Sequence, residues 1–306
     1  FVAGANSVLY SNSTPDFSDI DKDSYNINPD EVEKKIKYYR KKRKKVKAVI
    51  ATDFAGNPCD WKKLKSLSYK YGFKLINDNC HAFGSQYLNN KKYAIKYADV
   101  VIQSFHPVKM ITTGEGGAII TNDIKLYKKI NNLRSHGIEK NLRKKEPWYY
   151  ELTNIGFNYR ITDIQCALGL SQLKKINKFI LKRKIIAKLY DNIFKDKRYL
   201  TIPKKEKNSS HAYHLYPLRI NFRKLKIDRS HLFEKMKKLN INLQVHYIPV
   251  HLQPVFRKNY YFKKGQFPQA EKFYEEEVSL PIHYSLNLSD VKKIAKIIIN
   301  FCESKK

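Results

Sequence analysis

Residues 98 to 123 read ADVVIQSFHPVKMITTGEGGAIITND, and they carry the clearest structural signal in the chain. Residues 98–105 are apolar almost throughout and predict a buried strand, and residues 116–123 (GGAIITND) predict another. Three of the chain's 11 glycines, Gly114, Gly116 and Gly117, lie within four positions. The glycines predict a turn with a demanding backbone conformation, directly after a single lysine, Lys109.

The same pattern continues upstream of this stretch. Residues 46–54 (VKAVIATDF) and 73–79 (FKLINDN) predict two further buried strands. The segment between them, residues 59–72, predicts a helix that ends at Gly72. Short apolar strands that alternate with helices indicate a sheet covered on both faces. We therefore predict an α/β domain whose sheet is largely parallel.

The second half of the chain predicts a long helix and a smaller domain. Apolar residues at helical spacing run from Ile161 to about Phe194 and predict one long helix. The polar, turn-rich residues 197–211 then mark a boundary. Beyond it, residues 211–220 and 241–250 predict strands, with a helix at 226–240 between them. We expect a large domain at 1–195 and a small α+β domain at 196–306.

Composition limits the classes of protein that fit. With 306 residues, of which 42% are hydrophobic, the chain can bury a large core. It contains neither an apolar run long enough to cross a bilayer nor a signal-like segment, so we expect a cytoplasmic protein with no membrane partner. The four cysteines lie far apart, without the spacing of a zinc site, so we expect reduced thiols and no metal centre.

The formal net charge of +32 raises the question of nucleic-acid binding. Much of the excess comes from lysine-rich segments such as residues 34–47, and Lys, Asn, Ile and Tyr are abundant everywhere. A general compositional bias is the simpler explanation. Attraction for phosphate-bearing small substrates or for nucleic acid stays open as an alternative.

Polar residues follow three successive predicted strands. They are Asp53 and Gly56 after the first strand, Asp78 and His81 after the second, and residues 104–109 after the third. Ligands of open α/β sheets collect at the C-terminal ends of the strands, so these groups are expected to converge. A carboxylate at one strand end and a lysine in the turn after the next suit pyridoxal phosphate chemistry, in which the lysine forms the Schiff base and the carboxylate keeps the pyridine nitrogen protonated.

The stretch SFHPVKMITTGEGGAIITND resembles the lysine-bearing segment of the pyridoxal-phosphate-dependent sugar-nucleotide aminotransferases of the DegT type. Further matches follow in order along the chain: FVAGANSVLY, DFAGNPCD, NDNCHAFGS, LRSHGI, GFNYRITDIQCALGLSQL, HAYHLY and VHYIPVHLQP. The resemblance implies the fold type I architecture of pyridoxal-phosphate-dependent transferases. In that architecture a large domain, with a mostly parallel sheet between helices, is joined to a smaller C-terminal α+β domain.

The resemblance also implies residue roles around pyridoxal 5′-phosphate. Lys109 would carry the cofactor and then move a proton between the amine carbon of the substrate and C4′ of the cofactor. Asp78 would pair with the pyridinium nitrogen, and His81 would lie near the ring and its phenolic oxygen. The remaining cofactor contacts would come from Ser104 at the phosphate, from Asn158 at the phosphate of the neighbouring subunit in a homodimer, and from Phe1 stacked on the ring.

A narrower resemblance concerns the substrate. Residues 147–151 (PWYYE), together with NYRITDIQCALG and VHYIPVHLQP, are similar to the enzymes that aminate C4 of a UDP-linked 4-keto-6-deoxy-N-acetyl hexosamine on the way to pseudaminic acid. Glutamate would be the amino donor. In that interpretation His246, Tyr247 and His251 line the substrate side. The alternative is that they end a small-domain strand and pack its loop.

The chain departs from the family pattern in two places. It begins with Phe1 in what reads as the middle of a packed element, so we expect a missing N-terminal part that would cup the cofactor phosphate. Such a fragment would bind cofactor poorly or fold incompletely. In addition, Asn77 stands where the family often has an acidic residue. Two alternatives remain open: amination of another dTDP-, UDP- or GDP-linked keto-sugar and, less favoured, a basic nucleic-acid-binding protein.

Overall fold

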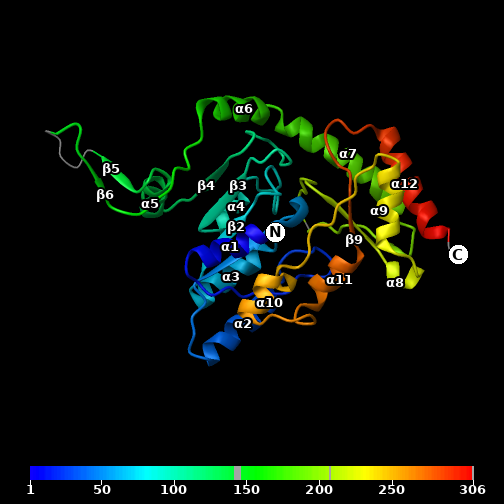
Figure 1. The fold of residues 1–306 in the computed structure, drawn as a ribbon, viewed down its shortest axis with the longest axis horizontal. Coiled ribbons are helices and arrows are strands. Elements are labelled where there is room, and N and C mark those ends of the chain that lie inside the picture. The colour runs from blue at the N-terminus through cyan, green and yellow to red at the C-terminus, as the bar shows by residue number, and fades with distance from the viewer. Residues whose placement is uncertain (141–145, 207, 305–306) are drawn as a thin grey trace.

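A four-stranded sheet forms the centre of the computed structural model, which describes residues 1–140, 146–206 and 208–304 (Figure 1). Its strands are β1 (Ala48–Thr52), β2 (Lys74–Asp78), β3 (Val100–Ser104) and β4 (Gly117–Ile120), and their order in the sheet follows the chain. The first three strands are parallel, and β4 runs antiparallel to β3. The four strands predicted in this region and the largely parallel sheet are therefore confirmed.

The parallel strands bring three loops to one edge of the sheet. Thr52 at the end of β1 lies opposite Asp78 at the end of β2, and Ser104 ends β3 beside them. Because parallel strands point the same way, the residues that follow each of them emerge at this edge. The register thus sets the starting points of the loops that carry Asp78, His81 and Lys109.

One face of this sheet carries the main core of the N-terminal part. The helices α2 (Pro29–Lys41) and α3 (Trp61–Tyr71) pack in that core with the strands. Its members with no exposed surface are Ala51, Cys59, Trp61, Leu64, Leu75 and Val101. The helix α3 ends at Gly72, which has a φ of 71° that suits glycine, as predicted. On the other face, alternate strand residues are only partly buried. Helices therefore cover one face of the sheet fully and the other only in part, whereas full cover of both faces was predicted.

An arm extends from the sheet after β4. It consists of α5 (Ile124–Arg134) and the antiparallel pair β5 (Ile138–Lys140) and β6 (Tyr150–Leu152). Figure 1 shows these elements reaching away from the rest of the molecule. Each residue of β6 is exposed, and α5 contains no buried residue. The arm therefore makes little use of the core of its own chain.

The single long helix predicted from Ile161 to Phe194 is wrong, because the structure has two helices there. They are α6 (Asp163–Leu173) and α7 (Ile176–Phe194). The break is a tight turn in which the Lys175 N–H donates to the carbonyl of Gln172, three residues back, at 2.9 Å. The apolar spacing continues across this turn, so periodicity alone did not reveal it.

The C-terminal part contains a second, antiparallel sheet of order β7-β8-β9. Its strands are β7 (Leu200–Thr201), β8 (Tyr216–Ile220) and β9 (Glu277–Leu280). The helices α7, α9 (Arg229–Lys238) and α12 (Leu288–Glu303) pack with it around one core. The predicted helix at 226–240 is confirmed as α9.

Two predicted strands in this part need correction. Residues 211–215 lie outside β8, and residues 241–250 form no strand. Because β7 and β9 occupy both sides of β8, the segment 241–250 meets this sheet only at the outer edge of β9, where Gln244 bridges to Ser279. The strand β9 itself was not predicted.

The second half of α7 belongs to the core of the C-terminal part. Ile186, Ala187, Tyr190 and Phe194 are buried there with residues from β8, β9 and α12. The predicted division between 1–195 and 196–306 therefore separates this helix from residues it packs against. We retain that division as a proposal about domain organisation, with α7 as the connecting helix.

The remaining helices are short. They are α1 (Val2–Tyr10), α4 (Tyr93–Tyr97), α8 (Phe222–Leu225), α10 (Pro254–Tyr260) and α11 (Pro268–Glu276), with 3₁₀ turns η1 (Phe54–Gly56) and η2 (Val250–Leu252). In the described ranges, no helix combines the length and the apolar character required to cross a membrane.

Candidate active site

Lys109 lies in the connection between β3 and β4. Its backbone N–H donates to the carbonyl of His106 at 2.9 Å, and its side chain is half-buried. Within the described residues its Nζ takes part in no hydrogen bond or ion pair. Burial lowers the pKa of Lys109, although the charges of Cys80 and Asp78 act in the opposite direction. This environment favours an amine that can act as a nucleophile or a base.

Asp78, the last residue of β2, is the carboxylate whose charge acts on this amine. The two side chains are not in contact as a pair. Asp78 accepts instead from Thr52 Oγ1 at 3.3 Å and from the Cys80 N–H at 3.2 Å. Both hydrogen bonds are long and leave lone pairs of the carboxylate open for a further donor. An amine and a carboxylate therefore lie in one site without neutralising each other.

His81 follows β2 and is buried, with 3% of its surface exposed. Its Nδ1 accepts from the Ala55 N–H at 3.3 Å, which places the ring proton on Nε2. Burial, and then the charge of Lys109, lower the pKa of His81 well below its ordinary value. His81 is therefore a neutral imidazole held by the 3₁₀ turn η1 that follows β1.

The loop after α9 brings His246 and Tyr247 to the same place. The Tyr247 ring lies 6.4 Å from that of His81 and 5.5 Å from that of Phe1. Burial, followed by Lys109, lowers the pKa of His246 to about 4. Burial, followed by Asp78, raises the pKa of Tyr247 to about 12. Both side chains are uncharged near neutral pH, and they extend the site from the sheet edge toward the C-terminal part.

Two of the predicted cofactor residues, Ser104 and Asn158, lie in different parts of the fold. Ser104 ends β3, where its Oγ accepts from the His106 N–H at 3.4 Å, close in sequence to Lys109. Asn158 is exposed, and its backbone bridges to Ser135 just after α5, at the base of the arm. The structure brings Ser104 to the sheet edge but leaves Asn158 with the arm.

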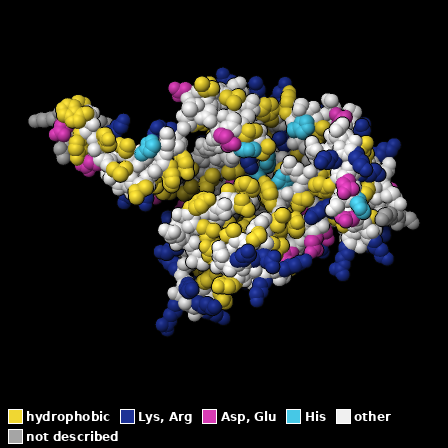
Figure 2. Space-filling view, in the orientation of Figure 1, with side chains coloured by type: hydrophobic (Ala, Val, Ile, Leu, Met, Phe, Trp, Pro, Cys, Tyr) yellow, Lys and Arg dark blue, Asp and Glu magenta, His cyan; other side chains and the backbone are white. Residues whose placement is uncertain are grey.

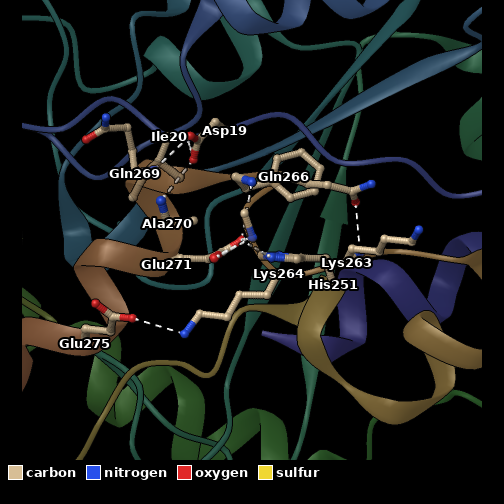
Figure 3. A network of polar contacts seen from close by, with 12 residues as sticks. Asp19, Ile20, His251, Lys263, Lys264, Gln266, Gln269, Ala270, Glu271 and Glu275 are labelled. Atoms are coloured by element: carbon tan, nitrogen blue, oxygen red, sulfur yellow. Dashed lines mark hydrogen bonds and ion pairs between the residues drawn. The ribbon is translucent and has the colours of Figure 1, made fainter.

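His251 is placed differently from the other predicted substrate residues. Its side chain is buried, and its Nε2 lies 2.9 Å from Glu271 Oε1 (Figure 3). Glu271 also accepts from the Gly265 N–H, while Asp19 accepts from two N–H groups at the start of α11. His251 thus joins the turn η2 to α11, and a substrate could reach it only by displacing this contact. Its place on the substrate side stays a prediction that this geometry does not favour.

His214 was not identified from the sequence, although it lies in the quoted motif HAYHLY. It is buried, and its ring lies 4.4 Å from that of His81. Its Nδ1 is buried and has no hydrogen-bond partner among the described residues. Burial, followed by the charges of His81 and Lys109, lowers the pKa of His214 well below the ordinary value. His214 was missed because residues 211–220 predict a strand, and a residue inside a strand was not considered as a site residue.

Asp53, the first of the strand-end carboxylates, has a structural environment. It is fully buried and accepts from the Cys59 N–H, Trp61 Nε1, Asn79 Nδ2 and Tyr93 Oη at 2.7 to 2.8 Å. Burial raises the pKa of Asp53 against these hydrogen bonds. The network holds the loops after β1 and β2 together, and these loops carry site residues such as His81.

The cluster fits pyridoxal 5′-phosphate, judged by what its groups leave open. Lys109 offers an amine without a partner among the described residues, Asp78 offers open lone pairs for a protonated ring nitrogen, and His81 offers a neutral ring. Several histidines gather in the middle of the molecule in Figure 2. Among the described residues there is no group of three or more His, Cys, Asp or Glu placed to hold a metal ion.

Comparison with known proteins gives concordant findings. The sequence model of the DegT/DnrJ/EryC1/StrS aminotransferase family matches residues 1–299. A UDP-4-amino-4,6-dideoxy-N-acetyl-beta-L-altrosamine transaminase from Campylobacter jejuni is 36% identical, over 100% of this chain and 78% of its own length. The structure of Helicobacter pylori PseC, an aminotransferase of pseudaminic acid biosynthesis, matches with a TM-score of 0.89 and 36% identity, over 99% of this chain and 78% of that one. The PLP-form of Spr1654 from Streptococcus pneumoniae matches with a TM-score of 0.86 and 25% identity, over 100% and 79% of the two chains.

Proposed function

We propose that this chain, which belongs to the DegT/DnrJ/EryC1/StrS aminotransferase family, transfers an amino group to C4 of a UDP-linked 4-keto-6-deoxy-N-acetyl hexosamine. The family consists of sugar aminotransferases, and the chain is an aminotransferase. The choice of substrate is supported by the relatives from Campylobacter jejuni and Helicobacter pylori. Its product would serve the biosynthesis of pseudaminic acid or a related surface glycan.

The observation that carries this proposal is the state of Lys109. In a chain with 60 Lys and Arg residues, this lysine is half-buried, without a hydrogen-bond or ion-pair partner in the described ranges, and has a lowered pKa. It lies beyond a strand whose neighbour ends in Asp78. Burial of an unpaired lysine costs stability, because it disfavours the charged form. A buried lysine without a partner is therefore typical of a site that uses the amine in a reaction.

Pyridoxal 5′-phosphate, when bound, would supply a carbonyl carbon for the amine and an electron sink for the bond that loses a proton. Lys109 would hold this group through Nζ and, once released, would take up and return the proton through the same atom. The carboxylate of Asp78 would hold a proton on the ring nitrogen, because a nearby negative charge stabilises a cation. The neutral His81 would donate through Nε2 without adding charge, and Ser104 would contribute at the phosphate.

The partners follow from the same proposal. Glutamate would be the amino donor, and the nucleotide-linked keto-sugar would be the acceptor that His246 and Tyr247 face. Amination of another dTDP-, UDP- or GDP-linked keto-sugar is the alternative, because the residues at the sheet edge serve any of these substrates. A cytoplasmic location stays a prediction.

We also propose a homodimer that completes the site. Apolar side chains of the arm and of α6 are strongly exposed, and Figure 2 shows them along the projecting arm. The most exposed are Trp148, Ile155, Tyr159 and Ile164, at 75%, 91%, 70% and 84%. Exposed apolar surface of this extent is typical of an interface. A second copy packed there would bring Asn158 of one subunit toward the phosphate site of the other.

The test is spectroscopic and catalytic. The purified full-length protein mixed with pyridoxal 5′-phosphate should develop the visible absorbance of a lysine-bound cofactor, and Lys109→Ala should lose it, whereas the exposed Lys128→Ala should keep it. A panel of UDP-, dTDP- and GDP-linked keto-sugars with glutamate then identifies the acceptor. Absence of the absorbance in the unmodified protein, together with salt-dependent binding of RNA or DNA that survives Lys109→Ala, would replace this proposal with nucleic-acid binding.

A further inference from the structure

A chain of hydrogen bonds connects His246 to a buried carboxyl group outside the cluster around Lys109. His246 Nδ1 lies 2.8 Å from Ser279 Oγ, and this hydroxyl is in turn hydrogen-bonded to Glu277 Oε1. The other carboxyl oxygen, Oε2, accepts from the backbone N–H of His246 at 2.9 Å. Glu277 and Ser279 lie on β9 and are 0% and 5% exposed, so water does not replace these contacts.

The hydroxyl of Ser279 has one proton, so it can donate to only one of its two neighbours, Glu277 or His246, at a time. When Ser279 donates to Glu277, its oxygen can only accept from His246, which then carries its proton on Nδ1 and has a lone pair on Nε2. When Glu277 carries a proton on Oε1 and donates it to Ser279, the hydroxyl donates to Nδ1, and the ring proton lies on Nε2. The protonation of Glu277 and the tautomer of His246 are thereby coupled.

We propose that Glu277 and Ser279 are positioning residues that select which nitrogen of His246 carries the ring proton. They thereby determine whether Nε2 acts as a donor or an acceptor toward the sugar nucleotide. This inference rests on the proposed function, because His246 is assigned there to the substrate side. Nε2 of His246 has no hydrogen-bond partner within the described ranges, which leaves it available for a substrate oxygen. Residues that orient a functional imidazole through its second nitrogen are a general device of enzyme sites.

The surroundings keep His246 neutral, so that its tautomer is the state that matters. Burial, and then the charge of Lys109, lower the pKa of His246, and His246 also interacts electrostatically with His81 and His214, whose pKa values burial lowers as well. The carboxyl group of Glu277 is influenced by Arg229 of α9, whose Nη1 donates to the backbone carbonyls of Tyr274 and Glu277. Tyr247 lies near enough to sense the charge of Glu277.

The direction of the chain should change with pH. Burial raises the pKa of Glu277 to about 8, against the hydrogen bonds from Ser279 and His246 and the charge of Arg229. Below that pH the carboxyl group is protonated, and His246 presents Nε2–H as a donor. Above it, Glu277 is ionised, the chain reverses, and Nε2 becomes an acceptor.

The experiment measures the tautomer directly. Protein loaded with pyridoxal 5′-phosphate and labelled at histidine is titrated by nuclear magnetic resonance between about pH 6.5 and about pH 9.5. The signal of His246 is assigned by its loss in His246→Gln. We expect a switch from the Nε2–H to the Nδ1–H form around pH 8, the pKa to which burial raises Glu277. A tautomer that stays constant through this range in the unmodified protein would overturn the proposal without any variant.

Variants locate the cause of the switch. Glu277→Gln mimics the protonated carboxyl group, because its amide donates to Ser279 and accepts from His246, so the Nε2–H form should persist at all pH values. Ser279→Ala should remove the pH response, and Ser279→Thr, which keeps the hydroxyl, should restore it. Glu276→Gln is the matched control, since Glu276 is paired with Arg219 instead.

Kinetics supply a second readout. We expect a substrate oxygen to accept from Nε2–H, so near pH 7 Ser279→Ala, which no longer fixes that tautomer, should raise the KM for the sugar nucleotide roughly 3- to 10-fold, the usual effect of one lost hydrogen bond. Near pH 9 the unmodified enzyme should show the higher KM and Glu277→Gln should not. A pH response of the tautomer without transamination would contradict the proposed function alone, while full activity with an unresponsive His246 would contradict this inference alone.

Discussion

At the scale of single residues, the surroundings of a side chain decided its chemistry. Burial lowers the pKa of Lys109 below the ordinary value of a lysine. His246 lies in the strand predicted at 241–250, and His251 is the first residue after it. His246 reaches the cluster around Lys109, and His251 is bonded to Glu271. The type of residue made Lys109, His246 and His251 candidates for the site. Only their contacts in the structure distinguish the two that lie in the site from His251, which is bonded to Glu271.

Replacing Lys109 by Met should raise the melting temperature near pH 7 while abolishing transamination. Because burial lowers the folded-state pKa, the unfolded chain binds more protons at this lysine between the two pKa values, and native stability rises with pH in that window. The gain given by Met should therefore shrink as the pH approaches about 10, near the pKa of a free lysine. Calorimetry at several pH values measures it, with Lys128→Met as control. Equal gains in both variants would contradict the assigned environment.

His251→Leu should lower stability without affecting the substrate. The variant loses the 2.9 Å contact with Glu271 and leaves that carboxylate with its backbone donors only. The expected cost is about 1 to 3 kcal/mol, measured by urea denaturation. The KM for the sugar nucleotide should stay within about twofold, whereas His246→Leu should raise it. A raised KM with unchanged stability would instead support the substrate role predicted for His251 from the sequence.

At the scale of elements, α7 connects the two halves of the site. Arg183 in this helix is buried, and its Nη1 donates to the carbonyls of Tyr213, His214 and Ile282 at 2.7 to 3.0 Å. It therefore holds the backbone of His214, whose ring lies against that of His81, and the segment after β9. Burial lowers the pKa of Arg183 to about 10, which still leaves it charged at neutral pH.

Arg183→Met should destabilise the protein by about 2 to 4 kcal/mol, because three buried carbonyls lose a charged donor. Met keeps much of the apolar length of the side chain, so the loss reports mainly on hydrogen bonding. Chemical denaturation measures the free energy of unfolding, and the exposed Lys188→Met on the same helix serves as control. An unchanged free energy of unfolding would show that these contacts do not hold the segments together. The visible absorbance of bound cofactor should also weaken, since His214 loses its support.

At the scale of the whole molecule, the arm contrasts with the rest. Its elements contribute little to either core, and Figure 1 shows them projecting from the rest of the molecule. Its apolar side chains Trp148 and Ile155 are 75% and 91% exposed. Such a segment gains its stability from a partner surface, and the proposed homodimer supplies one. The net charge of +32 acts against self-association at long range, so the contact depends on apolar burial.

Ile155→Asp and Ile164→Asp should dissociate the proposed dimer. Each places a charge on an apolar side chain that is 91% or 84% exposed in the single chain and buried in the proposed contact. We expect the dissociation constant to rise at least about tenfold, measured by sedimentation velocity over a concentration series. Leu239→Asp, at a position 44% exposed in the C-terminal part, is the matched control. Dimers that persist in both the Ile155 and the Ile164 variants would place the interface elsewhere.

The elements that the sequence predicted well are those whose signal is local. The strands β1 to β4 are short apolar runs bounded by polar residues or glycine, and α3 has its own capping residues, Asp60 and Gly72. The elements that it missed depend on distant partners. The strand β9 is a strand because β8 lies beside it, whereas residues 241–250 meet the sheet only through the isolated bridge between Gln244 and Ser279 at the outer edge of β9.

The sequence by itself determined that Asp78 and Lys109 would follow neighbouring strands, because apolar runs fix the strands and parallel pairing places their ends at one edge. It also carried the motifs of the aminotransferase family. Only the tertiary structure decided which later residues join them. His214 and His246 reach the cluster through Arg183 and through Glu277 and Ser279, contacts between segments far apart in the chain. No local pattern encodes such contacts, since each depends on where another part of the chain has packed.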